Sequence, residues 1–314
     1  MIAETDLSRS PAIGVVIASV IARQPSSHHA WDLNEELLVS QGVCDMKNAI
    51  CPCGSARYTT VFSGTYRRMG DDSYDFEVAE CCVCGLRRTM PPPSDVVYKS
   101  GQAHSSEREV GAAPWSAPIL DAIKTRVPGG RLLDVGCNVG DLVALALEAG
   151  FDAQGIDLDP RAIAAGRQAG RPVQVGSLDS QSGTFDAVVM NHVLEHVVDL
   201  PRLLSSLQRA LGETGLAFIY VPNYTGLLPR IMGDSWIGWL PMEHVWQFSP
   251  ASFRRSVETL SSLRVVELAT NGVIEPPSQG VKGVLKRAVA VLSTATGQGD
   301  EIAAVLATPL AGSA

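Results

Sequence analysis

The sequence predicts an α/β protein with a mainly parallel sheet, preceded by a small cysteine-rich unit. From residue 114 onward, short apolar runs of the kind that form buried strands alternate with segments of helical periodicity. Pro follows a capping residue where two of the helices are expected to start, after Asp159 and after Ser249. Five Cys between residues 51 and 84 indicate the separate unit upstream. The expected strands are RLLDVG, AQGIDLD, PVQVGS, FDAVVM, GLAFIYV and LRVVEL.

Composition limits the class of protein. With 46% hydrophobic and 18% charged residues the chain is globular. Its net charge of -8 argues against binding to nucleic acid or anionic membrane by bulk charge. No apolar run reaches the roughly 18 residues that span a bilayer. We therefore expect a small-molecule partner, with no nucleic acid and no membrane.

The cysteines and the first residues point to a reducing compartment. Seven Cys, an odd number grouped in pairs, do not resemble a secreted disulfide framework. The start MIAETDLSRS lacks the positive charge of a secretion signal. We expect a cytoplasmic protein. Its predicted organisation is an extension over 1–48, a Cys-rich unit over 49–95, a linker over 96–113 and the α/β domain over 114–314.

The extension carries no chemical motif. Met46 stands just ahead of the first Cys pair, so a natural start there would make residues 1–45 dispensable. We therefore expect residues 1–45 to be dispensable for folding and activity.

The Cys-rich unit is predicted to bind structural zinc. Zinc takes four soft ligands in a tetrahedron, and two turns can each present two thiolates. One turn holds a C-x-C pair and the other a C-x₂-C pair, and the predicted ligands are Cys51, Cys53, Cys81 and Cys84. The alternative is a set of buried free thiols. Cys44 and Cys82 remain outside the set.

The segment LLDVGCNVGDLVAL predicts a strand, a glycine-rich turn and a helix. Gly136 and Gly140 let the backbone approach a ligand without a Cβ clash. Asp157, at the end of the next expected strand, can accept both hydroxyls of a ribose. Together with Asp134 and Asp141 it would repel phosphates and suit a cationic, phosphate-free nucleoside. The turn also lacks the third glycine typical of dinucleotide sites.

Residues 114–270 resemble class I S-adenosylmethionine-dependent methyltransferases. The resemblance rests on LDVGCNVGD, GIDLDP, FDAVVMNHVLEHV and GLAFIYVPN, in that order. It implies a Rossmann-like seven-stranded sheet whose last strand is antiparallel. We expect 301–308 to return as an antiparallel edge strand, after an inserted helix over 280–293.

The resemblance also implies the cofactor contacts. The methionine end would lie on the turn, at Asp134, Gly136, Cys137, Asn138 and Gly140. Asp157 would bind the ribose and Leu158 would lie against the adenine. Ser177 and Leu178 match the position that contacts the adenine amino group, and Asn191 matches the strand end beneath the methyl donor.

The Cys-rich unit followed by this domain resembles a subgroup that methylates sugars and secondary metabolites. We therefore expect an O- or C-methyltransferase that acts on a small acceptor of that kind. Two alternatives stay open: an NAD-type oxidoreductase and a non-catalytic zinc-ribbon protein that uses the domain for assembly. The oligomeric state is not predicted.

Three histidines are candidates for the chemistry. His192, Glu195 and His196 would share one face of a helix, where relatives carry E-x-x-E-H and bind a divalent metal. This chain has His192 in place of the first Glu, and a structural Glu195–His196 pair is the preferred interpretation.

His244 is the expected general base, because an unperturbed imidazole pKa of about 6.5 suits proton removal near pH 7. It lies in the segment 224–248, which is rich in aromatic residues and is predicted to form a substrate wall; a small local core is the alternative. The aromatic residues are Trp236, Trp239, Trp246 and Phe248.

Overall fold

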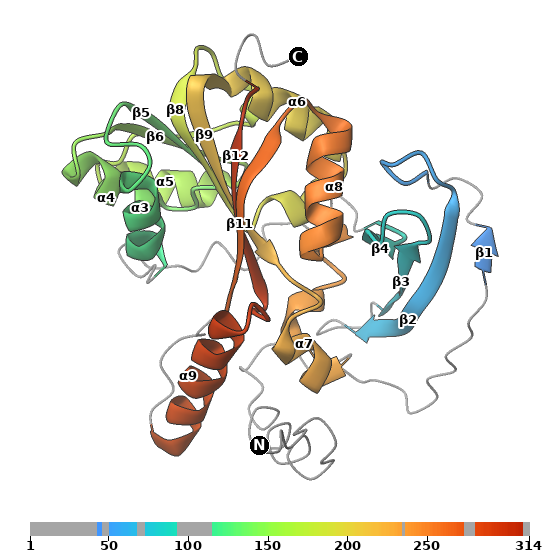
Figure 1. Ribbon diagram of the computed structural model, residues 1–314. Coiled ribbons are helices and arrows are strands. Elements are labelled where there is room, and N and C mark those ends of the chain that lie inside the picture. Colours follow the sequence, from blue (N-terminus) through green and yellow to red (C-terminus); the bar gives the residue numbers. More distant parts are fainter. Residues whose placement is uncertain are drawn as a thin grey trace, which may run out of the picture.

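The structure is a computed structural model that describes residues 43–45, 50–67, 73–92, 115–233, 236–272 and 280–309. Two sheets organise the chain, one of seven strands and one of five (Figure 1). The predicted linker and almost all of the N-terminal extension lie outside the described residues. Among the described helices, none is both long and apolar enough to cross a membrane.

The large sheet has the strand order β11-β12-β9-β8-β5-β6-β7. Six of its strands run parallel and β12 runs antiparallel to both of its neighbours, β9 and β11. The strands are β5 (Arg131–Val135), β6 (Asp152–Asp157), β7 (Val173–Val175), β8 (Phe185–Asn191), β9 (Leu211–Pro222), β11 (Arg264–Asn271) and β12 (Glu301–Ala307). The predicted seven-stranded α/β sheet is confirmed.

One detail of that prediction is wrong, because β12 is not an edge strand. It lies between β9 and β11, and its Ile302 and Leu306 are fully buried. A strand this apolar is more stable with both backbone edges paired and its side chains covered than at a solvent-exposed edge.

Helices cover both faces of the large sheet (Figure 1). One buried cluster includes side chains of α3 (Ser116–Lys124), α4 (Asp141–Glu148) and α5 (Pro160–Gln168), and the other includes side chains of α6 (Leu200–Ala210) and α8 (Pro250–Leu260). The predicted helix starts are present, because Asp159 accepts the N–H of Arg161 and Ser249 forms a capping box with Ser252. The expected inserted helix is α9 (Gly280–Ala295).

The small sheet is antiparallel and contains a strand from the α/β domain. Its order is β1-β2-β3-β4-β10. The strands are β1 (Val43–Asp45), β2 (Arg57–Arg67), β3 (Ser73–Cys81), β4 (Arg87–Met90) and β10 (Trp246–Gln247). Because β10 lies between β9 and α8 in the chain, the Cys-rich unit and the α/β domain share one sheet.

The aromatic residues of 224–248 form core, which corrects the expectation of a substrate wall. Trp236 and Trp239 are 5% and 6% exposed and pack with Phe62, Phe76 and Val78 of the small sheet. Trp246 and Phe248 are 3% and 0% exposed and belong to the main core. Large apolar rings gain most by complete burial, and the small sheet supplies the surface that buries them.

Candidate functional site

The glycine-rich turn at the end of β5 requires its glycines. Gly136 and Gly140 have φ of +75° and +80°. A Cβ at Gly136 would lie 2.6 Å from Val193 Cγ2, and one at Gly140 would lie 2.7 Å from Val173 Cγ1. Both the backbone conformation and the close packing therefore exclude a side chain at either position.

Asp134 and Asp157 place two carboxyl groups at the carboxyl ends of β5 and β6. The Asp157 carboxylate accepts the N–H groups of Asn138 and Asp159, each at 2.8 Å. Burial raises the pKa of Asp157, although those two N–H groups oppose the effect. Burial, followed by repulsion from Asp157, raises the pKa of Asp134 to about 8. A cationic ligand at this turn would be favoured by the Asp157 carboxylate, and it would oppose the repulsion that helps to keep Asp134 protonated.

The remaining positions matched to the cofactor lie at the same edge of the sheet. Leu158 is 65% exposed directly after β6, and Leu178 is buried. Burial raises the pKa of the Cys137 thiol, so this residue packs as a neutral side chain. Asn191 is the last residue of β8. The sequence-predicted cofactor positions thus extend along the carboxyl ends of β5, β6, β7 and β8.

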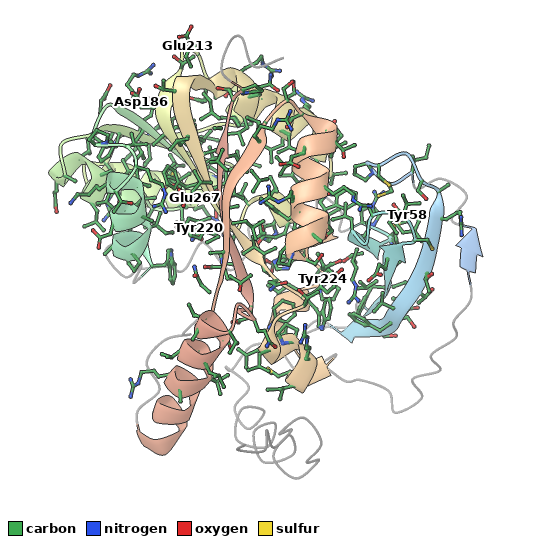
Figure 2. The ribbon with its side chains drawn as sticks, viewed as in Figure 1. Tyr58, Asp186, Glu213, Tyr220, Tyr224 and Glu267 are labelled. Atoms are coloured by element: carbon green, nitrogen blue, oxygen red, sulfur yellow. The ribbon has the colours of Figure 1, made fainter. Side chains whose placement is uncertain are left out.

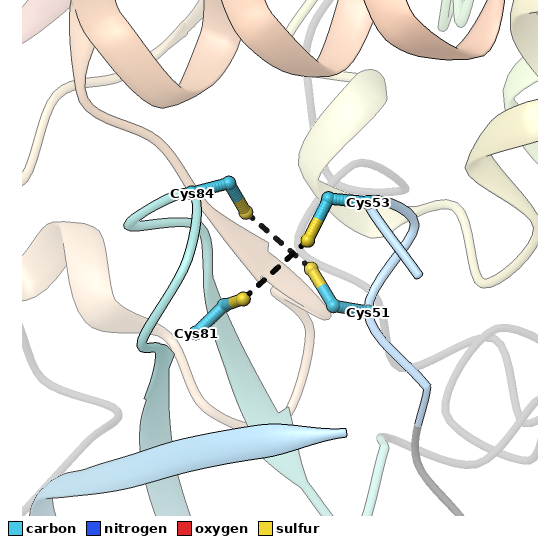
Figure 3. A group of neighbouring side chains, drawn as sticks. All are labelled: Cys51, Cys53, Cys81 and Cys84. Carbon is cyan, nitrogen blue, oxygen red and sulfur yellow. Dashed lines mark hydrogen bonds between the residues drawn. The ribbon is translucent and has the colours of Figure 1, made fainter. Parts of the chain in front are cut away.

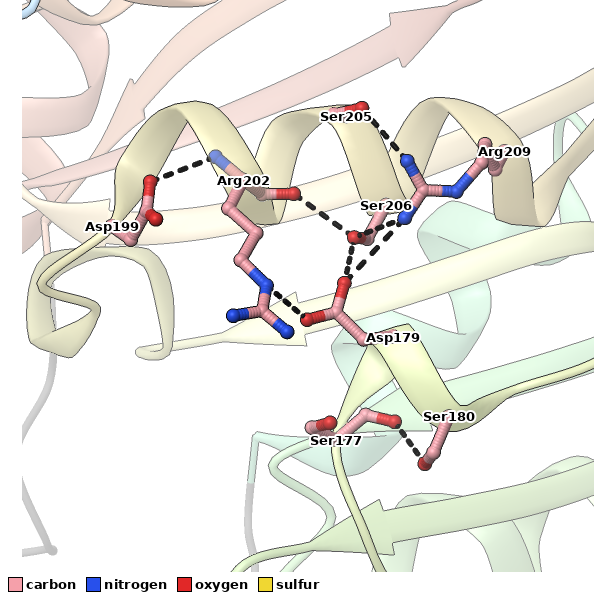
Figure 4. Close-up of polar contacts among 8 residues, drawn as sticks. All are labelled: Ser177, Asp179, Ser180, Asp199, Arg202, Ser205, Ser206 and Arg209. Atoms are coloured by element: carbon pink, nitrogen blue, oxygen red, sulfur yellow. Dashed lines mark hydrogen bonds and ion pairs between the residues drawn. The ribbon is translucent and has the colours of Figure 1, made fainter.

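The turn after β7 is anchored on α6 (Figure 4). This turn, the short helix η3 (Leu178–Ser180), carries Asp179, which hydrogen-bonds to Ser206. The same carboxylate pairs with Arg202 at 2.7 Å and with Arg209 at 3.5 Å. These contacts fix the position of Ser177 and Leu178 relative to the sheet.

A second cluster follows β8. His192 has φ of +55°, and a single turn of 3₁₀ helix, η4 (Leu194–His196), follows it. His192 Nδ1 lies 3.0 Å from Glu195 Oε1, and its Nε2 lies 3.5 Å from Glu301 Oε2. Burial would lower the pKa of His192, but the two carboxylates outweigh it and raise that pKa to about 10.

Glu195 is a fully buried carboxylate. Its burial would raise its pKa, but His192 above all, with smaller contributions from His196 and His244, lowers the pKa to about 2. Its Oε1 contacts His192, whereas its Oε2 has no hydrogen-bond partner among the described residues. An ionised, buried oxygen without a partner is costly unless a cation or donor reaches it.

His196 and His244 lie beside this carboxylate. Their rings meet edge to face with centroids 4.7 Å apart. His196 Nδ1 lies 3.0 Å from the Glu243 carbonyl oxygen, and His244 Nδ1 lies 2.9 Å from that of Gly238. His244 Nε2 is 4.0 Å from Glu195 Oε1. Each ring therefore turns its Nε2 away from its backbone contact, and in His244 this atom lies near the carboxylate.

The geometry corrects two expectations about the histidines. Glu195, His196 and His244 have ligand atoms within 4.8 Å of one another, and His192 is not part of this group. The predicted helical face fails because His192 has a left-handed backbone and η4 is only one turn. The pKa of His244 is also not unperturbed, because burial and then His196 lower it to about 3.

The four predicted zinc ligands converge (Figure 3). Cys51 Sγ lies 3.4 Å from Cys84 Sγ, and Cys53 Sγ lies 3.6 Å from Cys81 Sγ. All four sulfurs are within 4.8 Å of one another. A tetrahedral zinc–sulfur site has sulfurs roughly 3.8 Å apart, so the set fits zinc. Hydrogen bonding from Cys51 lowers the pKa of Cys84 to about 5, which favours a thiolate there.

Two residues that contact the second cluster, Glu301 and Thr89, were not predicted from the sequence. Glu301, at the start of β12, carried no signal beyond its place in an expected strand. Thr89 of β4 looked like an ordinary strand residue, although its hydroxyl reaches His244. His244 itself was selected, but its grouping with Glu195 and His196 depends on a tertiary contact.

Comparison with known proteins agrees with the fold. Residues 107–260 match the family described as "Methyltransferase domain". The ubiquinone biosynthesis O-methyltransferase of Idiomarina loihiensis is 27% identical over 168 residues, which cover 48% of this chain and 68% of that protein. The enzyme of the same name from Methylobacterium nodulans is 31% identical over 164 residues, which cover 48% of this chain and 65% of that one.

A solved structure of a SAM-dependent methyltransferase from Archaeoglobus fulgidus aligns with a TM-score of 0.45 and 19% identity, over 61% of this chain and 92% of that one. The family match covers the glycine-rich turn and strands β5, β6, β7, β8 and β9 of the seven-stranded sheet, and it ends before β11 and β12. The chain therefore carries a class I S-adenosylmethionine-dependent methyltransferase domain, and it is an enzyme of that class.

Proposed function

We propose that the protein transfers the methyl group of S-adenosylmethionine to a hydroxyl oxygen of a small acceptor, beside a divalent cation held by Glu195, His196 and His244. Oxygen as the acceptor atom is supported by the relatives from Idiomarina loihiensis and Methylobacterium nodulans, which are named O-methyltransferases. A sugar or secondary-metabolite acceptor is supported by the joining of a Cys-rich unit to this domain, the combination that resembles enzymes of those substrates.

The cofactor is proposed to lie along the carboxyl ends of β5 to β8. Asp157 would accept the ribose hydroxyls through the lone pairs not used by Asn138 and Asp159. The exposed Leu158 offers an apolar surface for the adenine. The carboxylate of Asp157 favours a ligand that carries a positive sulfonium and an ammonium group, whereas Asp134, with a pKa of about 8, is protonated at neutral pH.

The proposal of a cation rests on one observation: Glu195 Oε2 is buried, ionised and without a hydrogen-bond partner among the described residues. The two imidazoles support it, since each has its Nδ1 beside a backbone carbonyl, the arrangement that orients metal-binding histidines. Two nitrogens and one oxygen suit zinc, manganese or ferrous iron better than magnesium.

A divalent cation in this place would lower the pKa of the acceptor hydroxyl, so that the hydroxyl could give its proton to water while its oxygen takes the methyl group and S-adenosylhomocysteine leaves. The contribution of the protein residues would be to hold the cation ligands in position. Glu195 is fixed by His192, and His244 by Gly238, so the set is organised before substrate arrives. We propose His244 as a ligand rather than as the general base, because a buried imidazole with a pKa of about 3 accepts a proton poorly at pH 7.

A structural zinc ion is proposed for Cys51, Cys53, Cys81 and Cys84. The support is the convergence of the four sulfurs at distances close to those of a tetrahedral site. Its contribution would be to stabilise the two turns of the small sheet.

The experiment is a cobalt titration of protein that carries one equivalent of zinc per chain, which the four thiolates of the Cys cluster are expected to take first. The wild type should bind about one further equivalent of Co²⁺ without the absorption of thiolate-bound cobalt. Glu195→Gln should lose this equivalent and most of the activity, and should keep affinity for S-adenosylmethionine. Glu267→Gln, at an exposed site on β11 (Figure 2), is the matched control and should change neither. Full cobalt binding by Glu195→Gln would refute the cation site.

A further inference from the structure

We infer that the Cys-rich unit completes the active site, with Thr89 of β4 as the residue that positions His244. The inference rests on the proposed function only in taking His244 as a site residue. The Cys-rich unit would then act on the chemistry as well as on stability.

The first observation is a buried hydrogen-bond network between the two units. Thr89 Oγ1 donates to the His244 carbonyl oxygen at 2.7 Å, and Gln247 Nε2 donates to Thr89 Oγ1 at 2.7 Å. Thr89 is 0% exposed, and His244 and Gln247 are each 3% exposed. The His244 carbonyl oxygen is buried, and its donors are the Thr89 hydroxyl at 2.7 Å and, at 3.3 Å, Gln247 Nε2, so the Thr89 hydroxyl is its nearer partner.

The second observation is that the backbone after His244 is held from two sides. The N–H of Thr89 donates to the Val245 carbonyl oxygen at 3.0 Å. On the other side, the N–H of Val245 donates to the Glu195 carbonyl oxygen at 2.7 Å. Val245 thus connects β4 to η4, and the relative position of His244 and Glu195 depends on where β4 lies.

The third observation ties β4 to the Cys cluster. The turn from Cys81 to Leu86 leads directly into β4, and it is closed by the Cys81 N–H, which donates to the Leu86 carbonyl oxygen at 2.9 Å. Tyr224 Oη, beside the small sheet in Figure 2, donates to the Gly85 carbonyl oxygen at 2.8 Å. Arg255 of α8 donates to the Val83 carbonyl oxygen at 2.7 Å. The turn that carries two cysteines is therefore fixed to the α/β domain.

These contacts give a continuous path from Cys84 to His244. A shift of the Cys81–Cys84 turn would move β4, and β4 would move the carbonyl of His244 through Thr89. Displacements of about 1 Å in a catalytic group can lower a rate by roughly 100-fold. Sequence alone gave no reason to connect Thr89 with the chemistry.

The test compares Thr89→Val, which keeps the shape and removes the hydroxyl, with Thr89→Ser, which restores it. Thr89→Val should lower kcat by about tenfold or more and weaken Co²⁺ binding to zinc-loaded protein by about tenfold, the usual size of an outer-shell effect. Affinity for S-adenosylmethionine should not change, and Thr89→Ser should recover most of the loss. Thr65→Val, whose exposed hydroxyl contacts Asp75 in the same sheet, is the control and should behave as wild type.

Gln247→Met is a second variant for use if Thr89→Val does not fold, and it should lower kcat in the same direction. A Thr89→Val protein that is less stable but keeps wild-type kcat and cobalt affinity would overturn the inference, because the Thr89 hydroxyl would then have a structural role only. Failure of the proposed function looks different: the zinc-loaded wild type itself would bind no cobalt. In that case the loss of kcat in Thr89→Val, with rescue by Ser, still decides the inference.

Discussion

The backbone N–H of Asn138 donates a 2.8 Å hydrogen bond to Asp157 Oδ2, which ties the glycine-rich turn to the end of β6. The same carboxylate accepts the Asp159 N–H through Oδ1. Asp157 therefore has a structural task in the turn in addition to its proposed contact with ribose.

Asp157→Ala should weaken the binding of S-adenosylmethionine by about 1.5–3 kcal/mol, the range for hydrogen bonds to a charged group. Loss of order in the turn would add to this effect. Calorimetry measures it, with Asp152→Ala as control, because Asp152 lies at the opposite end of β6 and is largely exposed. An unchanged dissociation constant would remove Asp157 from the cofactor site.

The titration of Asp134 should make the free energy of unfolding fall as the pH rises. Its pKa is raised to about 8 in the folded chain, against about 4 when unfolded. Between these values the folded state holds the extra proton, so the free energy of unfolding decreases with pH across that window.

Asp134→Asn removes this titration. The free energy of unfolding of the variant should equal that of the wild type near pH 4. At pH 8 it should be higher by at least about 1 kcal/mol, which corresponds to roughly 2–4 °C in Tm. Thermal unfolding without cofactor across this pH range measures the difference. A constant offset between the two proteins at all pH values would contradict the assignment.

The Cys cluster should hold about one zinc ion per chain. Cys84→Ser should lose that metal and lower Tm, since the two turns would lose their common ligand. Cys82→Ser is the matched control because Cys82 is exposed and outside the group of four. Metal analysis of untreated protein decides the matter, and equal zinc content in both variants would count against this ligand set.

Trp239→Ala should destabilise the protein by about 3–5 kcal/mol, the usual cost of removing a large buried ring. Trp239 is 6% exposed and packs on Phe62 of the small sheet, with ring centroids 4.9 Å apart. The partly exposed Trp115 is the control, and Trp115→Ala should cost much less. Denaturant unfolding gives the comparison. A variant with normal stability and a raised KM for the acceptor would restore the substrate-wall interpretation.

Much of the large sheet was predictable because its parallel strands are buried on both faces and therefore appear as continuous apolar runs. The glycine-rich turn was also visible, since Gly136 and Gly140 are required by local backbone conformation. In both cases the signal lies within a few consecutive residues.

The rest depends on contacts between distant segments. The strand β10 has only two residues, too few for any periodicity, and its Trp246 pairs with Arg88 of β4, which lies 158 positions earlier in the chain. The burial of Trp239 and the grouping of His244 with Glu195 follow from this pairing. Spacing along the chain could not reveal either, and the left-handed backbone of His192 has no sequence signal of the kind that glycine gives.

The position of β12 between β9 and β11 has a consequence for the order in which the protein can fold during synthesis. Glu301–Ala307 pairs with β9 on one side and with β11 on the other. Until the ribosome has released these residues, β9 has an open edge and β11 cannot join the sheet. The nascent chain must therefore protect two unpaired strands until residues 301–307 have been made, and a message truncated before Glu301 would leave both exposed to aggregation.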